Sequence, residues 1–337
     1  MKPYDELMEQ TLRRTFSDAD ASKGLFGSGP DRAVSALKSF WAQGTHPTTI
    51  VECPLLGPAS YDVLVGSYGD SLVPGTHLPE ANPPACRAAY DWASSLDGRR
   101  HVELFFELDA DGPEGQHAGI HCRHSGNLDA ADEFYRVIGE GWRAPLYRDV
   151  AERLPDGWRA EFAAVFAGRL GSPTRLELLL TREARRLVGE SPAHLRLCFD
   201  RMGFSAYDGE MLEEISHLAS ISLLDTLQFD ILPDGSLGGT FSITSCFERT
   251  GGDFAHLFQD DGPVGLICGT YERMGVADGR WRFAEQAVFA TKKLDLSDPK
   301  LRQPIMFSLP NCSKAKWTDA RPQPAKIYLL QGALVRE

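Results

Sequence analysis

The chain has 337 residues, of which 42% are apolar and 24% charged, so it is long enough to bury a large core and has an ordinary globular composition. Its formal net charge of −12 argues against a nucleic-acid backbone or an anionic membrane surface as the main partner. No stretch approaches the roughly 18 consecutive apolar residues that a membrane-spanning helix needs. Small molecules and peptides are left as candidate ligands.

The seven cysteines are odd in number, and no two of them have the C-x-x-C spacing. That pattern favours reduced, buried thiols over a disulfide framework or a thiolate zinc site. Residues 1–16, MKPYDELMEQTLRRTF, are polar and amphipathic and lack the apolar core of a signal peptide. We therefore expect a cytoplasmic protein.

The first third of the chain is predicted to begin with helices and to continue with strands. Apolar residues at helical spacing predict two helices within residues 1–45, separated by a loop at 24–30. Short β-rich runs follow at 48–58 and 61–70. A Gly- and Pro-rich loop then leads to a helix over 86–96.

The clearest strand signal lies at 101–108, HVELFFEL, where apolar and polar residues alternate. The turn-forming sequence DADGPEG follows, and HAGIHCRH at 117–124 is predicted to return as the second strand of a hairpin. A second hairpin is predicted where residues 226–232 and 237–247 flank Pro233-Asp234-Gly235, because Pro presets its φ and Gly tolerates a positive φ.

The remaining elements alternate between helices and strands. Helices are predicted over 134–142, 146–154, 157–168 and 210–223. Further strands are predicted over 174–181, 193–201, 283–291, 303–309 and 324–332.

Hairpins imply antiparallel pairing, and no Gly-rich turn marks a Rossmann unit or a P-loop. About ten antiparallel strands are more stable when closed, since closure removes the exposed sheet edges. We therefore predict an α+β fold: an antiparallel β-barrel of about ten strands surrounded by helices. Residues 1–337 would form a single barrel domain, with N-terminal helices in 1–45 and repeated strand pairs and helices in 46–337.

The polar faces of the predicted strands can be interpreted in two ways. They carry charged and amide side chains at His101 and Glu103, Arg175 and Glu177, Arg196, Gln228 and Asp230, and Lys326 with Tyr328. In an open sheet these faces simply contact water. In a closed barrel they line a solvated lumen, where basic groups can hold an anion and carboxylates can move protons.

Three segments resemble the aromatic prenyltransferases of the αββα barrel type, including those that act on ribosomal peptides: PAKIYLLQ, LQFDILPDGSLGGTFSI and TIVECPLLG. The resemblance implies a ten-stranded barrel that uses an isoprenoid diphosphate as co-substrate. It also implies that Lys326 and Tyr328 contact the diphosphate, with Arg175 and Arg196 as helpers, and that Glu52 is the hydrogen-bond partner or general base for the acceptor.

The activity implied by this resemblance is transfer of an allyl group to an aromatic or peptide acceptor. Cations that neutralise the departing diphosphate would promote formation of the allyl cation. His121, Gln228 and Trp317 are candidate acceptor-binding residues. Magnesium is compatible with this chemistry but not required by it.

Two other functions remain open, as does the question of whether the chain is catalytic at all. His117, His121, Cys122 and His124 form a dense group of metal-ligand types, which a metal-dependent enzyme would use. On a straight strand, however, Cys122 and His124 point away from His121. Alternatively, a free sheet edge would bind an extended peptide by strand addition during peptide maturation.

Overall fold

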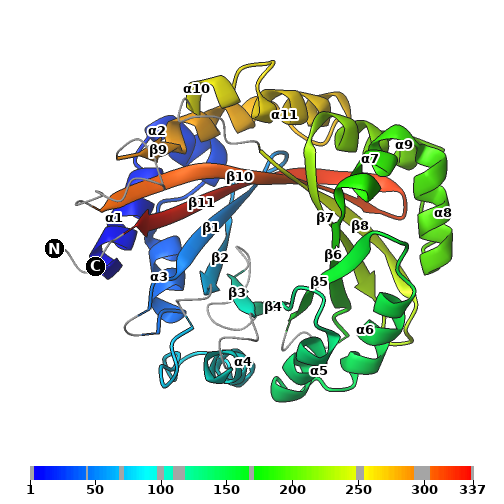
Figure 1. Cartoon of the computed structure of the whole chain (residues 1–337). Helices are drawn as coiled ribbons and strands as arrows, with labels where there is room; N and C mark the ends of the chain where they lie inside the picture. The colour runs from blue at the N-terminus through cyan, green and yellow to red at the C-terminus, as the bar shows by residue number, and fades with distance from the viewer. Residues whose placement is uncertain are drawn as a thin grey trace.

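The structure is a computed structural model, and it describes residues 4–42, 45–67, 72–96, 102–108, 118–166, 171–247, 254–291 and 304–334. The described strands form one antiparallel sheet that curves around a central axis, and the helices lie on its outside (Figure 1).

Ten of the eleven strands pair in a closed order, and β9 (Phe289–Ala290) is a two-residue addition beside β10. The barrel strands, in chain order, are β1 (Thr48–Pro54), β2 (Asp62–Ser67), β3 (Glu103–Leu108), β4 (Ala118–Arg123), β5 (Trp158–Phe166), β6 (Thr174–Leu180), β7 (Leu223–Ile231), β8 (Leu237–Cys246), β10 (Ile305–Thr318) and β11 (Arg321–Leu334).

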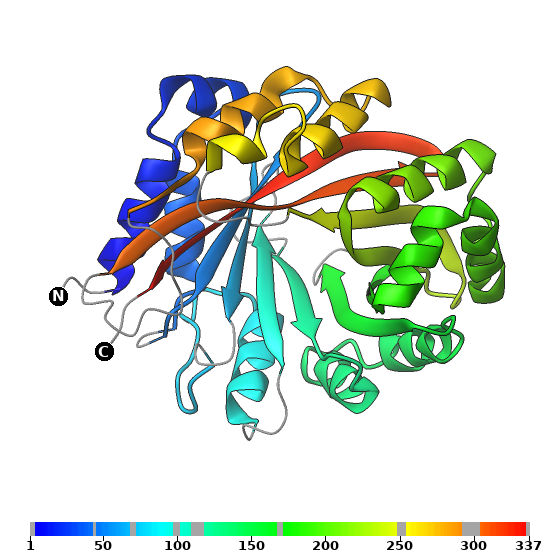
Figure 2. The same cartoon turned by 45° about the horizontal axis from the view of Figure 1, so that its top comes forward.

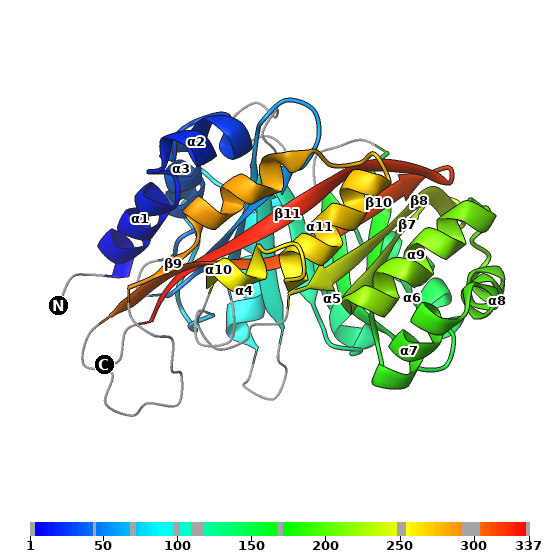
Figure 3. The same cartoon turned by 90° about the horizontal axis from the view of Figure 1, so that it is seen from above.

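The last two strands close the barrel. β10 and β11 are each 14 residues long and cross the whole molecule (Figures 2 and 3). β10 pairs with β8 through its second half, and β11 pairs with β1 through Lys326 to Gln331. β10 and β11 also pair with each other, which completes the ring. The predicted closed antiparallel barrel is therefore confirmed. The ring formed by these ten described strands has no free edge to which an extended peptide could add as a further strand.

The helices surround the barrel (Figure 1). The helical segments, in chain order, are α1 (Tyr4–Thr15), α2 (Ala19–Ala21), the π-helix η1 (Ser22–Phe26), α3 (Asp31–Ser39), α4 (Pro84–Ser95), α5 (Leu128–Val137), α6 (Arg143–Glu152), α7 (Arg182–Glu190), α8 (Pro192–Met202), α9 (Gly209–Ile221), α10 (Phe254–Leu257), α11 (Pro263–Arg273) and the 3₁₀-helix η3 (Gly279–Ala287). Among these described helices, none is long and apolar enough to cross a membrane.

The hydrophobic core fills the layer between the barrel and the helices. Most apolar side chains of the strands point outward into this layer, as period-two alternation requires, although some, such as Ile50 and Leu64, face the lumen. Phe229 and Phe241 on the barrel pack against Phe199 of α8, with ring centroids 5.8 and 5.0 Å away. Trp317 of β10 extends the same cluster and is fully buried.

Three of the predicted elements are wrong. The segment 193–201, predicted as a strand, lies in helix α8, which begins at an N-cap formed by Ser191 with Pro192 in the first turn and ends at Gly203, whose φ is +79°. The segment 157–168, predicted as a helix, contains strand β5. Arg159 and Glu161 alternate with apolar residues in its first half, but the pairing shifts register between Ala160 and Phe162 and residues 162–166 are all apolar, so the period of two is not kept along the whole strand. Most of 283–291 is the 3₁₀-helix η3 instead of a strand.

Candidate active site in the barrel lumen

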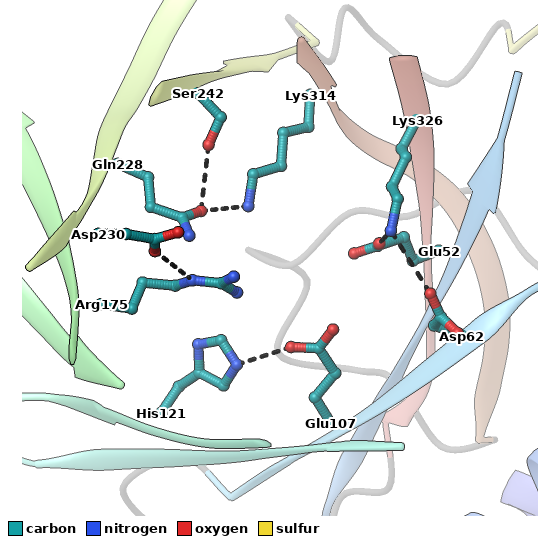
Figure 4. Close-up of polar contacts among 10 residues, drawn as sticks. All are labelled: Glu52, Asp62, Glu107, His121, Arg175, Gln228, Asp230, Ser242, Lys314 and Lys326. Carbon is teal, nitrogen blue, oxygen red and sulfur yellow. Dashed lines mark hydrogen bonds and ion pairs between the residues drawn. The ribbon is translucent and has the colours of Figure 1, made fainter. Parts of the chain in front are cut away.

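The inner face of the barrel encloses a cavity of about 500 Å³, within the usual size range of small-molecule sites. Side chains from every one of the ten barrel strands line it. Of the two interpretations of the polar strand faces, the structure supports the enclosed lumen. Figure 4 shows the charged groups pointing toward one another across this space.

Lys326 lies at the centre of one polar cluster. Its ammonium group donates a short hydrogen bond to Glu52 of β1 and lies 3.4 Å from Asp62 of β2 (Figure 4). Burial disfavours the charged lysine, but the charges of Glu52 and Asp62 outweigh it and raise the pKa of Lys326. The ammonium group therefore remains charged, and Glu52 is held as its buried partner.

A second pair lies on the neighbouring strands. His121 of β4 is 2.9 Å from a carboxylate oxygen of Glu107 of β3, and both residues are only 7% exposed. Burial alone would raise the pKa of Glu107, but the hydrogen bond and charge of His121, together with Arg175 and Lys326, hold it well below its usual range. This pair fixes a carboxylate on the lumen wall.

Arg175 of β6 is held by carboxylate and aromatic neighbours. Its Nε is 3.5 Å from Asp230, and its guanidinium lies over the ring of Phe166 with 4.9 Å to the centroid. Burial opposes its charge, whereas Asp230 and Glu107 raise its pKa. Neither Arg175 Nε nor Asp230 Oδ1 has a hydrogen-bond partner within the described residues, so both retain bonding capacity.

Two cations in this site were missed by the sequence analysis. Lys314 and Lys316 project into the lumen from β10, across from Thr244 and Ser242 of β8. Among the described residues neither lysine forms an ion pair; Lys314 donates a short hydrogen bond to Gln228, whose Oε1 also accepts one from Ser242 at 3.2 Å (Figure 4). The alternation of lysines with Ala315 and Trp317 was a strand signal that could have identified them.

Burial and crowding of like charges act on both lysines. Burial lowers the pKa of Lys314 and Lys316, and the neighbouring cation Arg175 lowers both further. Carboxylates, led by Glu177 for Lys314 and by Asp230 for Lys316, only partly oppose this. An anion bound between these cations would relieve their repulsion, so this part of the lumen is suited to a multiply charged anion.

The remaining predicted site residues divide into two groups. Tyr328 and Gln228 line the cavity together with Glu52, and Glu52 is the cross-strand partner of Tyr328. Burial and the charge of Glu52 raise the pKa of Tyr328 well above its usual value, so its hydroxyl stays protonated.

Arg196 and Trp317 do not lie in the lumen. Arg196 is exposed on α8 because its segment is a helix outside the barrel. Trp317 occupies an outward position of β10, where its Nε1 donates a 2.8 Å hydrogen bond to Glu214 of α9. Neither residue is among those that line the cavity.

The histidine cluster does not assemble into one metal site. His117 lies outside the described residues, and His121 faces the lumen. His124 instead bonds the Tyr147 hydroxyl of α6 at 2.7 Å, outside the barrel. Within the described chain, the carboxylates close enough together to hold a metal ion are Glu52, Asp62 and Glu107. The Lys326 ammonium already neutralises part of that group.

Proteins of known structure share this architecture. No model of a known protein family matches the sequence, and no curated protein matches it. Solved structures do match over nearly the whole chain, and they are aromatic prenyltransferases with the αββα barrel. 6-Dimethylallyltryptophan synthase from Micromonospora olivasterospora, in complex with DMASPP and Trp, has a TM-score of 0.54 and 10% identity, with 96% of each chain covered.

Two further solved structures match the same fold. Prenyltransferase PriB has a TM-score of 0.51 and 11% identity, with 98% of this chain and 96% of that chain covered. 5-Dimethylallyltryptophan synthase from Streptomyces coelicolor has a TM-score of 0.50 and 10% identity, with 97% of each chain covered. At this level of identity the likeness establishes the fold, and the fold implied by the sequence resemblance is confirmed.

Proposed function

We propose that the chain is a prenyltransferase that moves an allyl group from an isoprenoid diphosphate to an aromatic acceptor. The observation that carries the proposal is the convergence of Arg175, Lys314, Lys316 and Lys326, from three strands, into one enclosed lumen. Structural neighbours in complex with DMASPP and Trp support the same choice of donor and acceptor.

The donor diphosphate would bind between Lys314, Lys316 and Arg175. The two lysines form no ion pair with a carboxylate among the described residues, and burial, with Arg175 adding to it, disfavours the charge of each. When the allylic C–O bond breaks, the electron pair leaves with the diphosphate. Fixed cations stabilise that developing charge without reorganising, which is the largest catalytic contribution that such a site can make.

Glu52 would serve the acceptor. The aromatic ring attacks the allyl cation through carbon, and the ring proton then passes to a nearby base. Glu52 is a buried carboxylate on the lumen wall, and its ion pair with Lys326 fixes it in position. Lys326 thus lies between the donor site and the acceptor site, and Tyr328 beside it would shield the cation through its ring face.

We assign the acceptor to small aromatic compounds or to an aromatic side chain of a peptide. His121 and Gln228 line the cavity and can orient such a ring. A cavity of about 500 Å³ has room for one ring and a five-carbon prenyl group. Isoprenoid diphosphate is the only co-substrate that the proposal requires, and it assigns magnesium no role.

The test is incubation with dimethylallyl diphosphate and a panel of acceptors, first tryptophan and tyrosine, then peptides that contain each. A mass gain of one dimethylallyl group on an acceptor supports the proposal. Glu52→Gln is expected to retain diphosphate binding and lose transfer. The combination of no mass gain on any acceptor and no thermal shift with the diphosphate would refute it.

A further inference from the structure

The seven cysteines occupy two different environments, and all seven lie in described parts of the chain. Five of them, namely Cys53, Cys86, Cys122, Cys198 and Cys268, belong to the core between the barrel and the helices. The other two, Cys246 and Cys312, line the lumen. Cys246 is the one cysteine of the seven that is not fully buried, so a small reagent in the lumen can reach it.

Cys246 and Cys312 are direct cross-strand partners. They face each other in the register of β8 and β10. Opposed residues of an antiparallel pair have Cα atoms about 4.5 or 5.5 Å apart, and both values fall within the range that a disulfide bridges without backbone movement. Both side chains line the same lumen, so they lie on the same face of the sheet.

The surroundings give the two thiols different reactivity. Cys312 is buried beside Tyr328 and Ile50. Its Sγ accepts a hydrogen bond from Asn311 Nδ2 at 3.6 Å. The hydrogen bond with Cys246, then burial, raises the pKa of the Cys312 thiol well above its usual value. Cys246 is the more exposed of the two thiols, so a reagent in the lumen reaches it first.

We propose that Cys246 and Cys312 form an oxidisable dithiol in the lumen, and that hydrogen peroxide converts it into a reversible cross-strand disulfide. The Cys246 thiolate attacks one peroxide oxygen and becomes a sulfenic acid, and the other oxygen leaves and is protonated to water. The Cys312 sulfur then attacks the Cys246 sulfur, the S–O bond breaks, and a second water leaves with the two remaining protons. In total, one peroxide is reduced to two waters while two thiols lose two electrons.

The disulfide has consequences for the lumen wall. It ties β8 to β10 covalently at the level where Cys312 pairs with Tyr328, which in turn pairs with Glu52 of β1. The bridge therefore lies on the strand next to Tyr328, which is the cross-strand partner of the proposed general base, Glu52. The inference concerns the dithiol alone and stands whether or not the chain transfers a prenyl group.

The experiment oxidises the full-length reduced protein with hydrogen peroxide, alkylates the remaining thiols after denaturation and maps the peptides by mass spectrometry. The expected product is one linked peptide that contains Cys246 and Cys312, removed by dithiothreitol, with the other cysteines alkylated. Oxidation is also expected to raise the Tm, because the bridge restrains the unfolded chain. This mapping needs no substitution, so it does not depend on any variant folding.

Two variants test the order of reaction. Cys312→Ser is expected to leave Cys246 as a sulfenic acid that dimedone traps, whereas Cys246→Ser is expected to leave Cys312 unmodified at the same peroxide dose. Cys198→Ser, on helix α8, is the matched control and should form the bridge normally. Recovery of both lumen cysteines as free thiols, or a bridge from either one to a core cysteine, would overturn the inference.

Discussion

The two faces of the barrel wall are both buried and have opposite chemistry. Along β10, Lys314 and Lys316 point into the lumen, while Ala315 and Trp317, one residue further on, are in the core beneath the helices. The outer face consists of apolar contacts with helices, whose burial stabilises the fold. The inner face carries charges that are partly paired and partly crowded together, beside apolar residues such as Ile50 and Leu64.

This difference separates stability from binding within single strands. Charges that lack partners in a folded protein reduce its stability, and they persist where a ligand supplies the missing partner. The outer face should therefore control unfolding, and the inner face should control binding and transfer. Each of the following substitutions changes one face, and its effects on stability and on binding or transfer are both measured.

The largest effect is expected on the inner face. Replacing Lys314 and Lys316 together by glutamine removes two cations from the proposed diphosphate site. We expect kcat/KM for prenyl transfer to fall by roughly 10²- to 10³-fold or more, since loss of one group that stabilises transition-state charge already has about this effect. Stability in urea should be unchanged or higher, because two crowded cations are removed. A loss of stability with transfer intact would reverse our assignment of the inner face.

Trp317→Ala tests the outer face of the same strand. It removes a fully buried indole and leaves Glu214 without its hydrogen bond, so unfolding should become easier by about 3–5 kcal/mol. Affinity for inorganic diphosphate, measured calorimetrically below the melting transition, should stay within twofold of the parent. Leu197→Ala, at an exposed position of α8, is the control and should change stability by less than about 0.5 kcal/mol. Weakened diphosphate affinity at full stability would instead place Trp317 among the ligand contacts.

The pH dependence of diphosphate binding is expected to be a smaller effect. The pKa values of Lys314 and Lys316 are lowered, so in the free protein both lose their proton at a lower pH than an ordinary lysine does. Affinity should therefore fall as the pH rises through these lowered values, before free lysine would titrate. Arginine at both positions stays charged and should move the fall to higher pH. A pH profile identical in the parent and in the arginine variant would show that neither lysine governs binding.

The smallest effect is expected for Arg196→Ala. This side chain is exposed on α8, outside the barrel, so both stability and transfer should stay close to those of the parent, with stability within about 0.5 kcal/mol. Unfolding in urea and steady-state transfer rates check the two properties. A tenfold loss of transfer would show that the helix contributes to ligand binding in some way that the present geometry does not include.

Much of the barrel could be predicted from local sequence patterns. In residues 175–178 charged and apolar residues alternate, and this pattern correctly placed Arg175 and Glu177 on the inner face. The Ser191-Pro192 start and the Gly203 end of α8 were also present in the sequence as helix signals, although the alternating residues between them were taken for a strand. Glu52, Lys326 and Tyr328 were placed on strands that do line the cavity.

Sequence alone determined which residues alternate, which segments turn and which side chains are apolar, because these depend on neighbours within a few positions. Only the tertiary structure decided which charges meet. Glu52 lies across from Tyr328 because β11 closes the ring against β1. Closure pairs residues that are hundreds of positions apart, and no local pattern encodes the register of such a pairing.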